Sequence, residues 1–392
     1  MQKTIFSNVA WRFLKGLSQF FCMILIVRNI DISDYGWYIS AVSAFELMAI
    51  ISIPGIVKIA LRSALANDER FQNLFTLKIL MLPMFGLGFV LIPDKLATFF
   101  FLAIVADHIS MFARVKLNQN RNYFVFNLLE NSKPILLILL ILIYLGTYNS
   151  DLSLLFLSII YFSISILLMI LNILAAYRLA GFNLRFEKPS YKDFTNSVYA
   201  SGNGLIATAV RRGAIMIAAL SFSYTDAAYL NIALQFLTIF TMIYSGISLS
   251  LTRDIYDLSI NFNQLRNYYS LPILGLIFSI LFSSVILYFY GSPLIGLIFG
   301  NDAIEASKIV YMAPIIVLLQ LPQLILMGIF MRQRRERLIL ILNVSMILIF
   351  VPISILYATN VIKLMYVILI FVFMTSILYI FTYKKNRKVL AK

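Results

Sequence analysis

The stretch NSVYASGNGLIATAVRRGAIMIAALSF, residues 196–222, decides what kind of chain this is. It is long enough to cross a bilayer, yet it carries two adjacent arginines, Arg211 and Arg212, beyond its middle. A guanidinium at membrane depth costs about 2.5–3.5 kcal/mol on insertion scales unless it faces protein, water or a ligand. The stretch therefore predicts a membrane helix with basic groups in the protein interior, where the guanidinium fork fits an anion such as phosphate.

The rest of the chain is as apolar as this stretch. Of its 392 residues, 61% are hydrophobic and 12% charged, whereas a soluble domain is nearer half apolar and a quarter charged. We therefore predict an all-α integral membrane protein with about twelve transmembrane helices, which are the runs long enough to span a bilayer. These runs are 8–28, 37–60, 73–93, 95–115, 126–147, 152–178, 196–222, 226–251, 269–290, 308–331, 338–357 and 363–383.

Basic residues are concentrated in alternate loops and in the C-terminal tail. By the positive-inside rule, this pattern places both termini and the even-numbered loops in the cytoplasm. Topology thus explains much of the net charge of +15, and we expect no nucleic-acid partner. The basic residues counted here are Arg62, Arg70, Arg114, Lys116, Arg121, Arg178, Arg185, Lys188, Lys192, Arg253, Arg266, Arg332, Arg334, Arg335, Arg337, Lys384, Lys385, Arg387 and Lys388.

The two halves of the chain resemble each other. An aspartate begins a predicted helix with scattered polar residues in both halves. It is Asp34 in ISDYGWYISAVSAFELMAI (32–50) and Asp226 in YTDAAYLNIALQFLTIFTMI (224–243). An even number of spans separates the two segments, which predicts two six-helix bundles related in parallel. The predicted bundles are residues 1–190 and 191–392.

Motifs for covalent chemistry are missing from the sequence. There is no Walker loop, CxxC or HExxH, the one histidine is His108, and the one cysteine is Cys22. We therefore expect a protein that is not an enzyme, with no catalytic residue, no metal site and no cofactor. Coupling of transport to H⁺, Na⁺ or the membrane potential stays open.

Ionisable residues inside the spans are the remaining candidates for a site. Such residues normally face the bundle interior, and here basic ones outnumber acidic ones about two to one, which predicts a cationic cavity. Because neighbours on a helix point about 100° apart, only one of two adjacent arginines can aim squarely at it. The candidates are Arg12, Lys15, Glu46, Lys78, Asp107, His108, Glu130, Lys133, Arg211 and Arg212.

Each candidate also has a simpler explanation. Arg12 and Lys15 share a helix face and either guide a substrate or snorkel to cytoplasmic headgroups. For Lys78, Glu130 and Lys133 we favour snorkelling or local pairing. Glu46 and Asp107 either neutralise basic neighbours or couple transport to an ion. His108 is either a satisfied polar residue, which we favour, or a proton relay.

Two segments resemble polysaccharide flippases of the Wzx type, in the superfamily of multidrug/oligosaccharidyl-lipid/polysaccharide exporters. They are SNVAWRFLKGLSQFFCMILIVRNIDISDYGWY (7–38) and GSPLIGLIFGNDAIEASKIVYMAPIIVLL (291–319), and the similarity runs nearly end to end. The residues that carry it are Asp34, Tyr35, Gly36, Tyr38, Phe299, Gly300 and Ala306. The two extra spans of lipid II flippases and a clear cation-site pattern of drug extruders are missing.

This resemblance implies a MATE-like exporter fold of two six-helix bundles that open alternately to either face. It implies outward transport of an undecaprenyl-pyrophosphate-linked oligosaccharide, such as an O-antigen unit, for lipopolysaccharide biosynthesis. It also implies a cationic central cavity to which Arg12, Lys15, Arg211 and Arg212 map. Partners would be the lipid-linked glycan, the bilayer, and the glycan polymerase with its chain-length machinery.

Two other functions remain open at this stage. One is a drug or small-molecule exporter of the same fold, which would act without sugar-assembly enzymes. The other is a membrane glycan polymerase or glycosyltransferase, which usually needs a sizeable outer loop. The longest outer loop here, residues 291–307, is short and rather apolar, so we favour the flippase.

Overall fold

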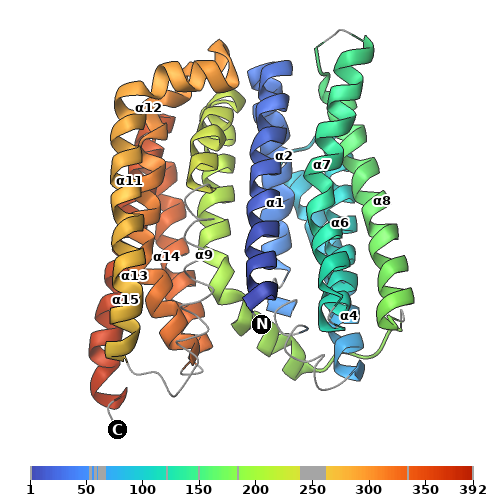
Figure 1. The fold of residues 1–392 in the computed structure, drawn as a ribbon, viewed down its shortest axis with the longest axis vertical. Helices are drawn as coiled ribbons and strands as arrows, with labels where there is room; N and C mark the ends of the chain where they lie inside the picture. Colours follow the sequence, from blue (N-terminus) through green and yellow to red (C-terminus); the bar gives the residue numbers. More distant parts are fainter. Residues whose placement is uncertain are drawn as a thin grey trace. The chain divides into compact units, whose positions relative to one another are not determined.

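The protein is described by a computed structural model (Figure 1). It describes residues 2–52, 55–56, 60, 68–120, 122–148, 151–182, 185–238, 262–332 and 335–390. Within these ranges, the description omits the side chains of residues 2–10, 12, 50–51, 68–70, 119, 201–207, 262–269, 271–272, 328, 331–332 and 386–390.

All regular secondary structure in the described residues is helical, and the chain divides into two compact units, Met1–Met216 and Ile217–Lys392. The division falls inside α9 (Tyr191–Ser221), whereas the sequence analysis divides the bundles before this helix. The assignment of α9 to the second bundle therefore stays a prediction. Because Arg211 and Arg212 precede Met216, both belong to the first unit.

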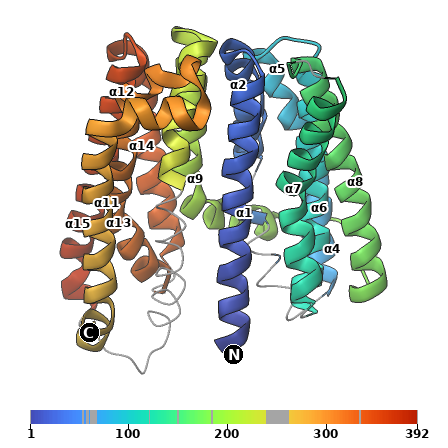
Figure 2. The same cartoon turned by 45° about the horizontal axis from the view of Figure 1, so that its top comes forward.

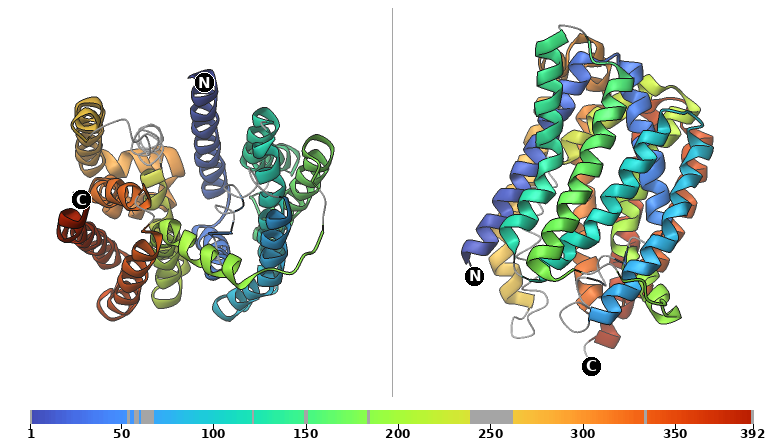
Figure 3. Two further views of the ribbon diagram at one scale, coloured as in Figure 1. Left: turned by 90° about the horizontal axis from the view of Figure 1, so that it is seen from below. Right: turned by 90° about the vertical axis from the view of Figure 1, so that its right-hand side faces the viewer.

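The first unit is built around α6, which packs along α8 and also contacts α7 and α2 (Figure 3). α1 runs beside α7 (Figure 2). At one end of the unit, the rings of Phe71, Phe75, Phe112 and Phe182 form a buried aromatic cluster. The elements are α1 (Gln2–Asn29), α2 (Ile32–Ile51), α4 (Asp68–Met81), η1 (Leu82–Leu87), α5 (Gly88–Leu91), α6 (Ala97–Gln119), α7 (Tyr123–Tyr148), α8 (Leu154–Ala180) and the first part of α9.

The second unit is a further set of helices, in which α13 packs against α15 and α11. The hydroxyl of the buried Tyr379 donates to Oδ1 of Asn343, 2.9 Å away, and ties α15 to α14. Residues 224–238 are helical, with Asp226 in the first turn, as Asp34 is in α2. The remaining elements are α11 (Phe262–Phe299), η2 (Asn301–Ala306), α12 (Ser307–Val310), α13 (Met312–Arg332), α14 (Glu336–Tyr357) and α15 (Val361–Leu390).

Within the described residues, eight helical segments are long and apolar enough to cross a membrane. They coincide with predicted spans three to six and nine to twelve. The other four predicted spans fall on α1, α2, α9 and residues 226–251, and parts of all four lie outside the described side chains. The eight are Phe71–Leu91, Ala97–Asn118, Tyr123–Tyr148, Leu154–Ala180, Ile273–Phe299, Asn301–Met327, Glu336–Tyr357 and Val361–Lys385.

The third span is a broken helix, which brings its backbone close to α2. After α4, Pro83 lies in the 3₁₀ segment η1, and α5 resumes at Gly88. A Cβ on Gly88 would lie 2.4 Å from Cδ1 of Phe45, whose side chain is fully buried in α2. Since Phe45 directly precedes Glu46, this close approach fixes the part of α2 that carries a candidate site residue.

Replacing Gly88 by alanine is expected to lower the free energy of unfolding by about 1–3 kcal/mol, because the new methyl group overlaps the Phe45 ring. Gly86→Ala is the matched control, since a Cβ there meets no atom within 4 Å. Thermal unfolding of the purified chain in detergent measures both. An unchanged melting temperature for Gly88→Ala would contradict the close packing of α5 on α2.

Candidate functional site

Two ion pairs join α7 to its neighbours. Glu130 and Lys133 are three residues apart on α7 and therefore share one face. Nζ of Lys15 in α1 lies 2.8 Å from Oε1 of Glu130, and Nζ of Lys133 lies 2.5 Å from Oδ2 of Asp107 in α6. Pro134 follows directly and cannot donate to the Glu130 carbonyl, so the helix lacks one hydrogen bond at this level.

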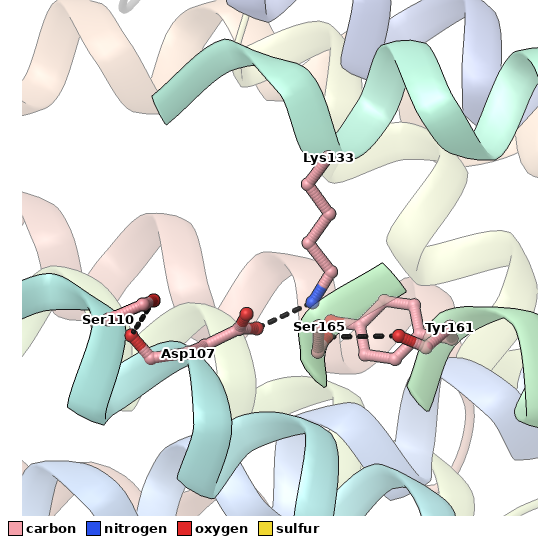
Figure 4. Close-up of polar contacts among 5 residues, drawn as sticks. All are labelled: Asp107, Ser110, Lys133, Tyr161 and Ser165. Atoms are coloured by element: carbon pink, nitrogen blue, oxygen red, sulfur yellow. Dashed lines mark hydrogen bonds and ion pairs between the residues drawn. The ribbon is translucent and has the colours of Figure 1, made fainter. Parts of the chain in front are cut away.

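Lys133 also contacts a third helix, as Figure 4 shows. Its ammonium lies 3.7 Å from the ring centroid of Tyr161 in α8, close enough for a cation–π interaction. Around it, Ser110 donates to the carbonyl of Asp107 (2.9 Å) and Ser165 to that of Tyr161 (3.0 Å), so both hydroxyls are satisfied within their own helices. Lys133 thus connects α6, α7 and α8.

The two adjacent arginines of α9 differ in the contacts of their Nε atoms. Nε of Arg212 lies 2.5 Å from Oε2 of Glu46 in α2. Nε of Arg211 is buried and has no hydrogen-bond partner among the described residues, and the same holds for Oγ of Ser43, one turn before Glu46. Arg211 therefore retains donor capacity that the described protein does not use.

Arg114 is a site residue that the sequence analysis missed, since it counted Arg114 among the loop residues. α6 continues to Gln119, so Arg114 is helical and lies two turns after Asp107 on the same face. Asp107, Glu130 and Lys133 are its charged neighbours. The seven-residue spacing from Asp107 was the signal that could have found it.

Together these groups form a polar cluster inside the first unit, with two more basic than acidic side chains. All three acidic members are ion-paired, so the excess charge stays positive. A surplus of positive charge in a poorly solvated interior attracts anions. The described members are Lys15, Arg114, Lys133, Arg211, Arg212, Glu46, Asp107 and Glu130.

Lys78 and His108 take part in none of these ion pairs, and both contact the Phe85 ring. Lys78 is only 2% exposed, so it does not snorkel to the surface. Its ammonium donates to the carbonyl and Oγ of Ser52 (3.2 and 3.3 Å), which caps the C-terminus of α2, a position where a cation complements the helix dipole. Nδ1 of His108 is buried and has no partner among the described residues.

The backbone of Arg12 lies in α1, one turn before Lys15, but its side chain lies outside the described residues. Its role as a substrate guide therefore stays a prediction. In the part of the chain that the structure describes, no group of three His, Cys, Asp or Glu side chains is placed to hold a metal ion.

Comparison with known proteins identifies the fold. No family model matches the chain, and no curated protein matches its sequence. Several solved structures do match the fold of the chain. An inward-facing multidrug resistance MATE family transporter of the MOP superfamily aligns over 97% of this chain and 95% of its own, with 14% identity and a TM-score of 0.66.

The chain has a MATE-like membrane fold. Lipid II flippase MurJ, in an inward closed conformation, aligns over 97% of this chain and 87% of its own, with 15% identity and a TM-score of 0.68. A mutant of a Vibrio cholerae MATE transporter aligns over 98% of both chains, with 15% identity and a TM-score of 0.57. With its apolar helices, the chain is thus a multi-pass membrane protein of the MATE-like fold, and the likeness at this identity shows the fold alone.

Proposed function

We propose that this MATE-like chain is a flippase for an undecaprenyl-pyrophosphate-linked oligosaccharide, such as an O-antigen repeat unit. It would carry the lipid-linked glycan from the cytoplasmic to the periplasmic leaflet of a bacterial inner membrane by alternating access, with both termini in the cytoplasm. The observation that carries the proposal is the basic surplus of the polar cluster, in which Nε of Arg211 is buried and has no hydrogen-bond partner among the described residues. A lipid II flippase has the same fold, so the fold is compatible with this class of substrate.

Four basic residues have separate roles in this proposal. Arg211 binds the pyrophosphate, since its guanidinium can offer two parallel donors to phosphate oxygens. Arg212 holds Glu46 and so fixes the orientation of α9 at this level. Arg12 and Lys15 guide the headgroup from the cytoplasmic side. The glycan polymerase and its chain-length machinery would receive the product.

The membrane potential can drive this transport. Moving negative charge outward runs with an inside-negative potential and gains about 2.3 kcal/mol per charge per 100 mV. Glu46 and Asp107, the carboxylates of two of these ion pairs, stay candidates for coupling to H⁺ or Na⁺.

Export of cationic drugs on the same fold is the competing function. A cationic substrate needs a free carboxylate, but all three acidic members of the polar cluster are held by basic side chains. The cluster therefore favours an anionic substrate. A glycan polymerase or glycosyltransferase is disfavoured because the loops lack room for a catalytic domain.

Deleting the gene in its host tests the proposal. We expect the surface glycan to be lost and the lipid-linked repeat unit to accumulate, with both effects reversed by the wild-type chain on a plasmid. Susceptibility to cationic drugs is the control measurement and should not change. Intact surface glycan together with increased drug susceptibility would contradict the flippase and favour the exporter of cationic drugs.

A further inference from the structure

A short segment, residues 185–194, comprises the end of the connection between α8 and α9 and the first turn of α9, and its backbone is fixed to the first unit. Gly181 ends α8 with φ 60°, and the chain then turns back so that Phe182 enters the buried aromatic cluster. The amides of Arg185 and Glu187 donate to Oε1 of Gln72 (3.4 Å) and Oγ1 of Thr76 (3.0 Å) in α4. The segment is therefore a held surface feature of the first unit.

The same segment exposes large aromatic side chains. Phe186 is 68% exposed, Tyr191 is 82% exposed and Phe194 is 37% exposed, and the last two rings stack on each other. Phe186 lies beside Phe75 of the buried aromatic cluster, with 6.1 Å between the ring centroids and the ring planes tilted by 33°. Three such rings within nine residues need an apolar or half-apolar environment outside the protein.

Basic side chains are interleaved with these rings. Arg185, Lys188 and Lys192 are all exposed, and none of them takes part in the ion pairs of the described residues. Two carboxylates share the segment, the half-buried Glu187 and the buried Asp193, which accepts from Ser190 Oγ, so basic groups outnumber acidic ones by one. The exposed face of the segment therefore carries a net positive charge beside its aromatic rings.

The position of the segment in the chain indicates which surface it contacts. Four residues separate it from the end of α8, which is long and apolar enough to cross a membrane, so we expect it to lie where hydrocarbon gives way to headgroups. Aromatic rings with Lys and Arg are the side chains that anchor protein at that depth. We propose that residues 185–194 bind the anionic phospholipid surface, with the rings between acyl chains and the three basic groups on lipid phosphates. This proposal does not depend on what the protein transports.

The charge part of the proposal is tested with the full-length chain in micelles containing phosphatidylglycerol or phosphatidylcholine. A basic residue at an anionic surface contributes roughly fivefold in affinity, so Arg185→Gln/Lys188→Gln/Lys192→Gln should weaken phosphatidylglycerol binding on the order of a hundredfold. Native mass spectrometry counts the bound lipid, and the melting temperature reports the stabilisation. The matched control is Lys95→Gln/Lys308→Gln/Lys363→Gln, which removes the same charge from exposed lysines elsewhere.

Loss of the phosphatidylglycerol effect in the first variant alone supports the proposal. An equal loss in both variants, or none in either, overturns it, and so does stabilisation by inorganic phosphate in phosphatidylcholine micelles. A spin label on Phe186→Cys in a Cys22→Ala chain tests depth independently. The label should be accessible to oxygen in bilayers; accessibility only to a water-soluble nickel reagent would place the segment in water and overturn the proposal.

Discussion

Replacing Arg211 by alanine is expected to lower the affinity of the purified chain for undecaprenyl pyrophosphate about ten- to hundredfold. The estimate corresponds to the loss of one charge-assisted hydrogen-bonded contact, about 1.5–3 kcal/mol. Because Nε of Arg211 has no partner in the described protein, its removal should not lower the melting temperature. Arg211→Lys keeps the charge but not the fork of donors, so we expect an intermediate affinity.

The neighbouring arginine should behave in the opposite way. Arg212→Ala leaves the Glu46 carboxylate without its partner, so it should lower the melting temperature more than it lowers the affinity. Arg337→Ala, an exposed arginine at the start of α14, is the control for both quantities. If Arg211→Ala binds undecaprenyl pyrophosphate as tightly as Arg337→Ala does, Arg211 is not the pyrophosphate ligand.

Replacing Lys133 by alanine is the second change with a large expected effect, this time on stability. It removes the ion pair with Asp107 and the contact with the Tyr161 ring, and it leaves a partly buried carboxylate unpaired. We expect the free energy of unfolding to fall by about 2–4 kcal/mol, below the range for fully buried pairs because the Asp107 side chain is 32% exposed.

A second variant separates the lost pair from lost packing. Lys133→Met/Asp107→Asn removes both charges and keeps much of the side-chain volume, so it should recover about half of the loss, roughly 1–2 kcal/mol. Lys308→Ala breaks the exposed pair between Lys308 and Glu305 in the second unit and should change the melting temperature little. Equal losses in Lys133→Ala and Lys308→Ala would show that the three-helix contact does not stabilise the unit.

The helices themselves could be predicted because each span is a continuous apolar run. Pro83 lies where the third span breaks, but nothing in the sequence indicates that Gly88 lies against Phe45. That close approach depends on how α2 and α5 pack, which hydrophobicity along the chain does not encode.

The sequence predicted which residues belong to the site, but not which of them contact each other. Helical period shows that Arg211 and Arg212 diverge by about 100°, but only the position of Glu46 on α2 decides which arginine is paired. Lys78 illustrates the same gap. Its position in the predicted span was compatible with both snorkelling and local pairing. Only the folded position of Ser52, whose carbonyl accepts from Lys78, shows that the side chain is paired locally.

The most direct measurement of the central claim is transport in proteoliposomes. Lipid-linked oligosaccharide that accumulates in the deletion strain is reconstituted with the purified chain, and a glycosidase that cannot cross the membrane is added outside. With the wild-type chain, glycan from both leaflets should be digested. With Arg211→Ala, as in vesicles without protein, only the outer-leaflet glycan should be digested. Complete protection of the inner-leaflet glycan in wild-type vesicles would contradict the assignment of this chain as a flippase.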